Sequence, residues 1–250
     1  MPTREPGRCS LLRGAPPSIP GIEKAHSSVW TAAGQLVVSD FDRNLWVCDG
    51  SLRGAVKIDS FPHFIDALAR SPVDGQRVAA GSGDWIRLYQ IPAGRLPAAG
   101  SERTLIRLPP EFGKVYRLAW SHDGRRLAVG SGLGRVCVID ADRKKNVIGT
   151  LASHAREIVA MAWSPDDRIL FTADLESVRV SDTMTTVMID ELRPGFDIQG
   201  VTFVEGATSA TGSTFVIGGG ASAVAASNDG EPFPARLLVI SLGRLGAAGH

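Results

Sequence analysis

Two short segments have the residue types of phosphate- and ion-binding loops, and neither has the complete pattern. The glycine-rich run is GSGLG (130–134). A phosphate loop must lead into a helix whose N-terminus holds the phosphate, whereas this one joins two strand-like runs. The run DFDRN (40–44) has the opening spacing of a calcium loop, but Leu45 replaces the glycine at its sixth position and Ser51 the glutamate at its twelfth. We interpret both as hairpin turns.

Histidine and cysteine, the usual ligands of zinc, are scattered along the chain. The five histidines are His26, His63, His122, His154 and His250, and the three cysteines are Cys9, Cys48 and Cys137. They form no CxxC or Cys/His cluster with the spacing of a metal site. Cys48 and Cys137 lie in apolar runs, where a thiol behaves as a small buried hydrophobic group. We therefore expect neither a metal nor a cofactor.

The charge balance argues against a nucleic-acid or membrane-surface protein. The 250 residues include 27 Lys and Arg against 26 Asp and Glu, a net charge of +1. The one basic cluster, Arg143-Lys144-Lys145, has no interleaved aromatic residues and reads as a solvated loop. No apolar run resembles a secretory signal or a membrane span. Because the cysteines are few and odd in number, we expect reduced thiols and a cytoplasmic protein, with the nucleus as the alternative.

Short strand-like runs separated by turn signals follow one another along most of the chain. For example, the runs 115–120, 126–129 and 135–139 are separated by Asp123-Gly124 and by the glycine-rich run. Asp-Gly between apolar runs is a strong hairpin signal, because glycine tolerates the positive φ of a tight turn. No amphipathic helical stretch of useful length is present. The pattern predicts an all-β fold.

The runs repeat. The segment VYRLAWSHDGRRLAVGSG (115–132) matches IVAMAWSPDDRILFTAD (158–174) and IDALARSPVDGQRVAAGSG (65–83), and segments 27–40 and 199–219 match more loosely. One position, at the end of the first run of each copy, is held by Trp30, Arg70, Trp120, Trp163 and Phe203, at separations of 40, 50, 43 and 40 residues. Each of the first four copies continues into a third and a fourth strand-like run. Four strands per 40–45 residues is typical of a β-propeller blade.

These units resemble WD repeats over residues 24–242. The resemblance rests on the hairpins SPDD (164–167), SHDG (121–124) and SPVDG (71–75), and on an aspartate that closes the third strand, as Asp49, Asp140 and Asp182. No copy has the tryptophan that precedes this aspartate in the family. The resemblance implies that His154 holds its blade by a hydrogen bond and that Thr172 supplies the hydroxyl of the same network.

A count of five blades does not decide whether the ring of the propeller closes. WD propellers commonly have seven blades, which at 43 residues each requires about 300 residues, although propellers of four to eight blades are known. We expect a closed or nearly closed ring of about five four-stranded blades. The alternatives are unrecognised strands near the N-terminus, or an incomplete ring that forms part of a larger assembly.

The innermost strands of the expected propeller carry little that could do catalysis. Their only charged residues are Asp66, Arg70 and Arg117. A glycosidase needs two carboxylates at a defined separation, and a metal enzyme needs several ligands. We therefore predict a protein that is not an enzyme. The alternative is an enzyme or small-ligand binder that uses Asp66 and Arg117 at the mouth of the channel.

Two sets of loops should emerge on one face of the propeller: those between second and third strands, and those between blades. WD-like propellers bind peptides or partner domains at such a face, and aromatic and arginine residues dominate binding hot spots. The predicted partner-binding residues are Phe41, Arg43, His63, Asp84, Trp85, Phe112, Lys114, Arg135, Arg156 and Glu157. For the aromatic residues the alternative is packing between blades.

The sequence thus predicts a disordered Pro/Arg-rich leader (1–22), a WD-repeat-like propeller (23–242) and a flexible tail (243–250). Its predicted function is a scaffold that binds a protein or peptide partner through the loop face. A subunit that completes a larger propeller assembly is a further alternative, and membrane or nucleic-acid partners are not expected.

Overall fold

The computed structural model describes residues 19, 21–100, 103–143, 147–203, 214–220 and 236–241. The tail predicted for 243–250 and most of the leader predicted for 1–22 lie outside these residues. Within them the chain is built from β-strands and one short 3₁₀ turn, η1 (Pro110–Phe112). The predicted all-β class is confirmed.

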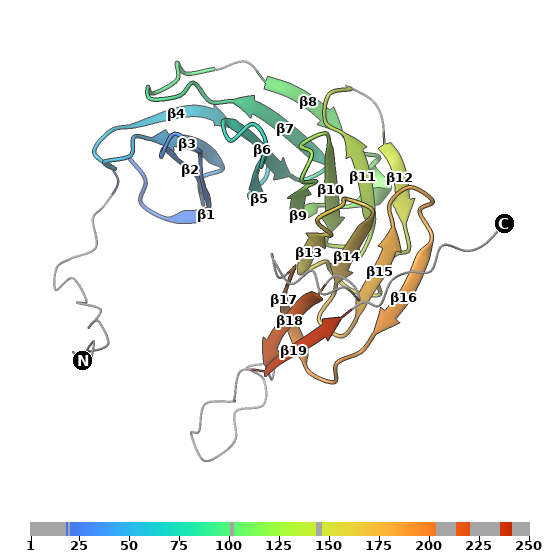
Figure 1. Ribbon diagram of the computed structural model, residues 1–250. Helices are drawn as coiled ribbons and strands as arrows, with labels where there is room; N and C mark the ends of the chain where they lie inside the picture. The colour runs from blue at the N-terminus through green and yellow to red at the C-terminus, as the bar shows by residue number, and fades with distance from the viewer. Residues whose placement is uncertain are drawn as a thin grey trace, which may run out of the picture.

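The strands form five antiparallel sheets in chain order (Figure 1). The first sheet contains β1 (Ala25–Trp30), β2 (Leu36–Asp40), β3 (Asn44–Cys48) and β4 (Ala55–Ser60). The second contains β5 (Ile65–Arg70), β6 (Arg77–Ser82), β7 (Trp85–Gln90) and β8 (Arg103–Arg107). The third contains β9 (Val115–Trp120), β10 (Arg126–Ser131), β11 (Val136–Asp140) and β12 (Val147–Leu151).

The fourth sheet contains β13 (Ala160–Trp163), β14 (Ile169–Ala173), β15 (Val178–Asp182) and β16 (Met188–Leu192). The fifth contains the three described strands β17 (Asp197–Phe203), β18 (Thr214–Gly220) and β19 (Arg236–Ser241). Each sheet is an up-and-down meander in which every strand pairs with the next one in the chain. This is the blade of a β-propeller, as the repeats predicted.

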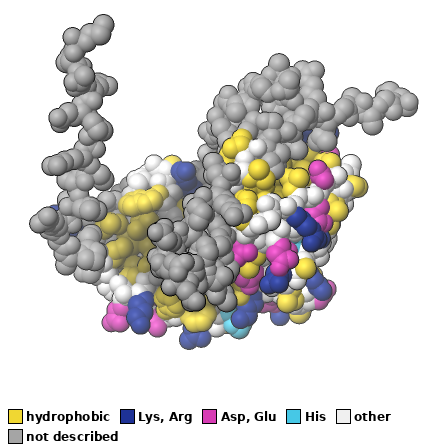
Figure 2. All heavy atoms as spheres, turned by 90° about the horizontal axis from the view of Figure 1, so that it is seen from below, with side chains coloured by type: hydrophobic (Ala, Val, Ile, Leu, Met, Phe, Trp, Pro, Cys, Tyr) yellow, Lys and Arg dark blue, Asp and Glu magenta, His cyan; other side chains and the backbone are white. Residues whose placement is uncertain are grey.

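The blades follow one another around an open arc. The innermost strands β1, β5, β9, β13 and β17 contact each other in that order. Figure 1 shows the first and the fifth blade at the two ends of this arc. Figure 2 looks at the molecule from the open side and shows hydrophobic side chains both toward the first blade and toward the last ones. The described residues therefore correspond to the incomplete ring, and the expectation of a closed ring is wrong for them.

The hydrophobic core is divided among the boundaries between neighbouring blades. Between the first and second blades, Val37, Leu45 and Val47 pack against Val78 and Tyr89, and all five are buried. Equivalent clusters fill the three other boundaries between neighbours. Alternate residues of a strand point to opposite faces, so each middle strand contributes to two clusters.

The glycine-rich run 130–134 is a hairpin, as predicted. It connects β10 with β11, whose strands pair directly on either side of it. At Gly130 a Cβ atom would lie 2.7 Å from Cγ2 of Ile158, so glycine lets the fourth blade approach. Gly134 has φ +74° and its Cβ would lie 2.4 Å from the carbonyl oxygen of His154. The glycines therefore serve blade packing, and the run DFDRN (40–44) likewise spans the β2–β3 turn.

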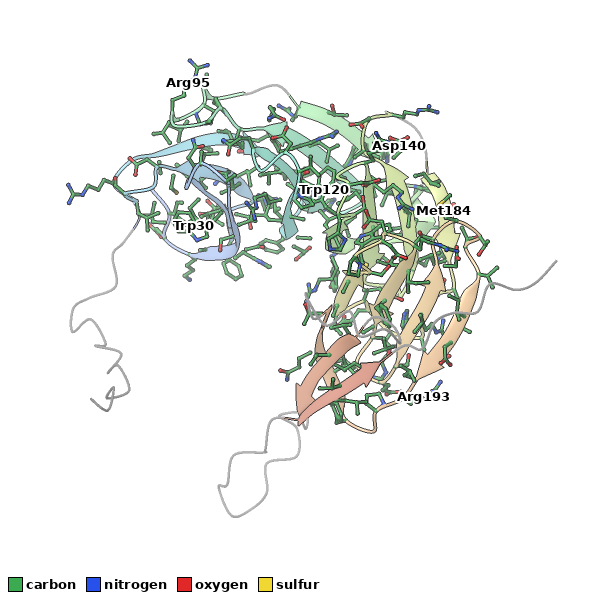
Figure 3. The ribbon with its side chains drawn as sticks, in the orientation of Figure 1. Trp30, Arg95, Trp120, Asp140, Met184 and Arg193 are labelled. Atoms are coloured by element: carbon green, nitrogen blue, oxygen red, sulfur yellow. The ribbon has the colours of Figure 1, made fainter. Side chains whose placement is uncertain are left out.

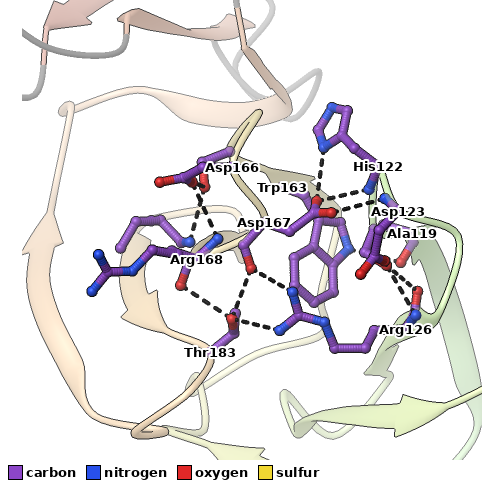
Figure 4. Close-up of polar contacts among 12 residues, drawn as sticks. Ala119, His122, Asp123, Arg126, Trp163, Asp166, Asp167, Arg168 and Thr183 are labelled. Atoms are coloured by element: carbon purple, nitrogen blue, oxygen red, sulfur yellow. Dashed lines mark hydrogen bonds and ion pairs between the residues drawn. The ribbon is translucent and has the colours of Figure 1, made fainter.

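A contact between arginine and tryptophan joins consecutive blades twice. Arg77 of the second blade lies 5.2 Å from the ring centroid of Trp120 in the third, and Trp120 Nε1 donates to the carbonyl of Ala69 at 3.1 Å. Arg126 and Trp163 repeat this arrangement one blade later, with Trp163 Nε1 donating to a third-blade carbonyl (Figure 4). We call this arrangement the Arg–Trp lock.

The fourth blade contains the hydrogen-bonded network that the WD resemblance implies. His154 Nε2 lies 2.8 Å from Thr172 Oγ1, and its Nδ1 lies 3.5 Å from Asp174 Oδ2. Burial is the main cause that lowers the pKa of His154 to about 4, and Asp174 acts against it. Burial also opposes the charged form of Asp174, but hydrogen bonds from the backbone of Glu176 and Ser177 outweigh it and lower the pKa of Asp174. The expected roles of His154 and Thr172 are confirmed.

Candidate partner-binding face

The two sets of loops lie on the same face, as predicted. The β2–β3 loop contacts the β4–β5 loop, because Phe61 N donates to the carbonyl of Arg43 at 2.9 Å. One blade later, Leu108 N donates to the carbonyl of Asp84, again at 2.9 Å. In the third blade His154 N donates to the carbonyl of Gly134 at 2.8 Å. Every such bond ties a hairpin within a blade to the connection that follows that blade.

Three aromatic rings meet on this face near the first end of the arc. The ring centroids of Phe41 and Phe64 are 6.1 Å apart, and that of His26 lies 5.0 Å from Phe41 and 6.3 Å from Phe64. We call these three residues the aromatic patch. Phe41 is 52% exposed and Phe64 is 49% exposed, so the rings contact each other and also face solvent. Stacked and edge-on pairs of this kind stabilise the arrangement of the rings by about 0.5–1.5 kcal/mol each.

The aromatic patch borders the carboxylate of Asp66. Asp66, on β5, lies 3.6 Å from Nε2 of His26. Burial is the largest influence and raises the pKa of Asp66, while His26, Lys114 and Arg117 act in the opposite direction. The guanidinium of Arg117 is held by the carbonyls of Val159 and Tyr116 at 2.7 and 2.8 Å. Asp66 is therefore paired with an imidazole of the aromatic patch, and Arg117 with backbone.

A second group on the face is built around Arg107 of β8. Its Nε donates to Asp84 at 2.9 Å, and its guanidinium lies 4.9 Å from the ring centroid of Trp85. Asp84 and Trp85 are both half-buried. Arg107 thus contacts both the ring of Trp85 and the carboxylate of Asp84. A partner that binds either group must therefore contact Arg107 as well.

The structure places the other predicted residues as follows. Arg43, His63, Lys114, Arg156 and Glu157 are exposed, and Arg135 is half-buried. Arg43 Nη1 donates to the carbonyl of Pro62 at 3.2 Å, and Arg156 pairs with Glu176 at 2.9 Å. The ring of His63 covers Gly83, where a Cβ would lie 2.6 Å from the imidazole.

Phe112 differs from the other aromatic candidates. It is 6% exposed and belongs to the core cluster between the second and third blades. The turn η1 directs its side chain inward, beneath the loop surface. For Phe112 the structure supports the packing alternative, and we correct its assignment as a partner-binding residue.

Sequence reasoning missed His26 and did not select Phe64. Neither has a local signal, because His26 lies within a strand and Phe64 in a loop between blades, 38 residues further on. Their shared environment arises only when β1 and β5 lie side by side. The one usable signal was the group of phenylalanines at loop ends, which included Phe41 and Phe64.

This face combines several kinds of polar and apolar side chain. It offers exposed aromatic surface, an imidazole–carboxylate pair and cations, all mounted on packed blades. Within the residues that the structure describes, no group of three or more His, Cys, Asp or Glu could hold a metal ion. The same part of the chain has no helix that is long and apolar enough to cross a membrane.

The repeats also match known proteins. A family model described as the anaphase-promoting complex subunit 4 WD40 domain matches residues 84–166, which contain β7 and β8 of the second blade, the whole third blade and β13 of the fourth. The repeats of this chain are similar to WD repeats. Its SPDD-type hairpins, its His154 network and its four-stranded blades agree with this assignment.

Curated relatives support the same family. The WD repeat-containing protein VIP3 of Arabidopsis thaliana is 42% identical over 59 residues, 23% of this chain and 18% of its own length. Protein HIRA of Dictyostelium discoideum is 30% identical over 148 residues, 52% of this chain and 12% of HIRA. WD repeat-containing protein 1 of Gallus gallus is 27% identical over 160 residues, 62% of this chain and 25% of the relative. The chain thus spans a quarter or less of the length of these relatives.

Proposed function

We propose that this WD-repeat chain is a non-enzymatic scaffold that binds a protein or peptide partner through its loop face, with the aromatic patch as the anchor. The proposal rests chiefly on one observation: Phe41, Phe64 and His26 present contiguous aromatic surface to solvent. Burying such rings in a partner is favourable, at about 25 cal/mol per Å² of apolar surface.

The rigidity of the blades supports this role. The loops that carry Phe41 and Phe64 are tied together by the Phe61–Arg43 backbone bond and by Arg43 to Pro62. Loops that are held in place lose little conformational freedom on binding. The family supports the coarser part of the proposal, because WD-repeat domains generally mediate protein interactions. The cytoplasm is the proposed compartment, with the nucleus as the alternative.

Affinity capture with a matched pair of variants tests this proposal. The chain and the double variant Phe41→Ser/Phe64→Ser serve as baits in extract from the source cells, and bound proteins are quantified by mass spectrometry. The control is Val73→Ser, which removes a still more exposed apolar residue (69%) from an SPVDG turn, a type of turn outside both sets of loops. Partners should be retained by the chain and the control and lost by the double variant. Equal capture by all three baits contradicts the role of the aromatic patch.

A further inference from the structure

The outer strand of each blade pairs on one side only within its sheet. Such edge strands add strands from other chains unless charged residues, irregular backbone or a covering segment protects them. The edge of β4 is covered, because Gly100 in the β7–β8 loop donates its N–H to the carbonyl of Ile58 at 3.0 Å. Figure 3 shows Arg95 of the same loop outside the ribbon of β4. Lys57 and Asp59 also give this strand charge.

The outer strand β12 has much less protection. Its sequence is VIGTL, and among the described strands at the outer end of a sheet it alone has no charged residue. By contrast, β8 has two arginines and β16 has an aspartate and a glutamate. The ladder between β11 and β12 skips Ile148, but Gly149, Thr150 and Leu151 pair regularly. Val147 and Ile148 are 44% and 48% exposed. The third blade thus ends in an uncharged, exposed strand.

Apolar side chains of the fourth blade lie beside β12. A Cβ at Gly149 would lie 2.4 Å from Cγ2 of Thr186, so the β15–β16 hairpin reaches the third blade. Figure 3 shows Met184 of this hairpin near Asp140, at the end of β11. We call the exposed apolar residues here the rim patch; they are Val147, Ile148, Met184, Val187, Met188 and Ile189, with exposed fractions from 40% to 73%. Exposed apolar groups of this kind mark interaction sites.

The backbone of an edge strand selects an extended polypeptide as its ligand. Main-chain hydrogen bonds to β12 would align an added strand, and side-chain contacts would select its sequence. Successive side chains of a strand point to opposite faces, so every second residue of the added strand would face the rim patch. Those residues should be apolar.

The charge next to β12 indicates what should flank the apolar residues. The sequence directly before β12 contains Arg143-Lys144-Lys145, and the side chain of Arg143 is 74% exposed. The two nearby acids, Asp140 and Asp142, pair with Arg143 and Arg77. The run therefore leaves an excess of positive charge. In antiparallel pairing the C-terminal end of an added strand lies beside the start of β12, so acidic residues are favoured at that end.

We propose that β12 binds an extended segment of a partner protein as an antiparallel fifth strand of the third blade. Alternate apolar side chains of the segment cover the rim patch, and acidic residues at its C-terminal end meet the basic run. A second copy fits this surface poorly, because Glu191 of its acidic outer strand is engaged by Arg179 and Arg193 at 3.5 and 2.9 Å. The aromatic patch belongs to the first two blades, so this proposal and the proposed function can fail separately.

A phage-displayed library of random 12-residue peptides tests the proposal. It is selected on the full chain and counter-selected on Ile148→Lys/Thr150→Lys, which gives β12 the charge that the other outer strands have. Selected peptides should alternate apolar and polar residues, with Asp or Glu near the C-terminus. Their affinity in fluorescence anisotropy should be at least ten-fold lower for the variant. Replacing their acidic residues by amides should weaken binding several-fold and reduce its dependence on salt.

The matched control is Leu105→Lys on β8, which changes an exposed apolar residue (45%) of another outer strand and should leave the affinity unchanged. Thermal unfolding shows whether both variants fold. Hydrogen exchange of the parent chain needs no variant: fast-exchanging amides of residues 147–151 should become slower when a selected peptide binds.

Three outcomes overturn the proposal. The first is that no peptide prefers the parent chain to the β12 variant. The second is slow exchange of every amide of residues 147–151 in the chain alone, which would assign the edge to another segment of this chain. The third is a dimer in light scattering that the β12 variant dissociates, which would assign the edge to a second copy. Equal binding of the acidic and amide peptides overturns the role of the basic run.

Discussion

The guanidinium of Arg126 lies 5.0 Å from the ring centroid of Trp163, across the boundary between the third and fourth blades. The same guanidinium donates to the carbonyl of Asp167 at 2.8 Å and to Thr183 Oγ1 at 3.0 Å. Asp167 in turn accepts hydrogen bonds from the backbone of His122 and Asp123 (Figure 4). One arginine therefore connects three segments of the next blade, and the two blades are joined by polar as well as apolar contacts.

Removing the indole of Trp163 should destabilise the protein in two steps. Trp163→Phe deletes the hydrogen bond to Ala119 and should lower the free energy of unfolding by about 1–2 kcal/mol. Trp163→Ala also leaves a cavity and should cost about 3–5 kcal/mol. Urea titration followed by circular dichroism measures both. Trp30→Phe is the control and should stay within about 0.5 kcal/mol of the parent, because its ring is half exposed. A cost for Trp163→Phe no larger than that of the control contradicts the lock.

Loss of the carboxylate of Asp59 should destabilise the boundary between the first and second blades. Asp59 pairs with Arg87 at 2.8 Å and Arg103 at 3.1 Å, accepts a hydrogen bond from Tyr89, and its side chain is 9% exposed. Asp59→Ala takes the carboxylate away from the guanidinium of Arg87, a side chain that is only 14% exposed, and we expect a cost of about 3 kcal/mol.

The matched comparison is Asp142→Ala. Asp142 pairs with Arg77 at 2.7 Å, but its side chain is 62% exposed, so the loss should be about 0–1 kcal/mol. Thermal and urea unfolding of both variants give the two values. Similar losses for Asp59→Ala and Asp142→Ala would show that burial of the first pair is not what makes it important.

The free energy of unfolding should decrease as the pH is lowered from neutral, because His154 is buried as a neutral imidazole. Burial lowers the pKa of His154 to about 4 in the folded state, whereas an unfolded histidine has a pKa of about 6.5. The unfolded chain therefore binds more protons between these values. The stability provided by the neutral imidazole is complete above about pH 6.5 and is lost as the pH falls toward 4.

Urea unfolding at intervals from about pH 7.5 to pH 4.5 measures this dependence. His154→Gln should be less stable at neutral pH and should show a flatter profile between about pH 6.5 and pH 5. The carboxylate of Asp174 has a lowered pKa, so its own contribution is lost only at more acidic pH. An equally steep profile for His154→Gln would assign the dependence to other groups.

The hydroxyl of Thr172 should contribute more to the stability of the fold than its methyl group does. Thr172→Val keeps the shape of the side chain and removes the partner of His154 Nε2, which lies 2.8 Å away in the core. An unpaired buried polar atom costs about 1–3 kcal/mol. Thr150→Val on the exposed strand β12 is the control and should change stability by no more than about 0.5 kcal/mol. Equal effects of the two substitutions contradict the network.

Much of the blade architecture can be predicted from the sequence. Strand alternation, Asp-Gly turns and the recurring Trp120 and Trp163 predict repeated four-stranded units, because hairpins are local and depend on neighbouring residues. The same holds for His154 and Thr172, whose separation of 18 residues lies within one repeat. Register and blade boundaries follow from this pattern.

The candidate site was less predictable. Phe41 and Phe112 are both phenylalanines in loops on one face, yet one is 52% exposed and the other 6%. Loop sequence alone does not say which way a ring points, since that depends on the space beside the neighbouring blade. The aromatic patch likewise needs β1 and β5 to lie side by side before His26 can contact Phe41 and Phe64.

Local sequence thus sets the fold class, the number of recognisable repeats and the residues of each hairpin, since all of these depend on interactions between residues close in the chain. The opening of the arc, the burial of Phe112 and the exposure of Trp30 depend on how one blade packs against another. Those contacts join residues far apart in the chain, such as Trp163 and Ala119, which are 44 positions apart. Such contacts depend on the shape and volume of the packing surfaces of both blades. They can therefore be assigned only from the tertiary structure.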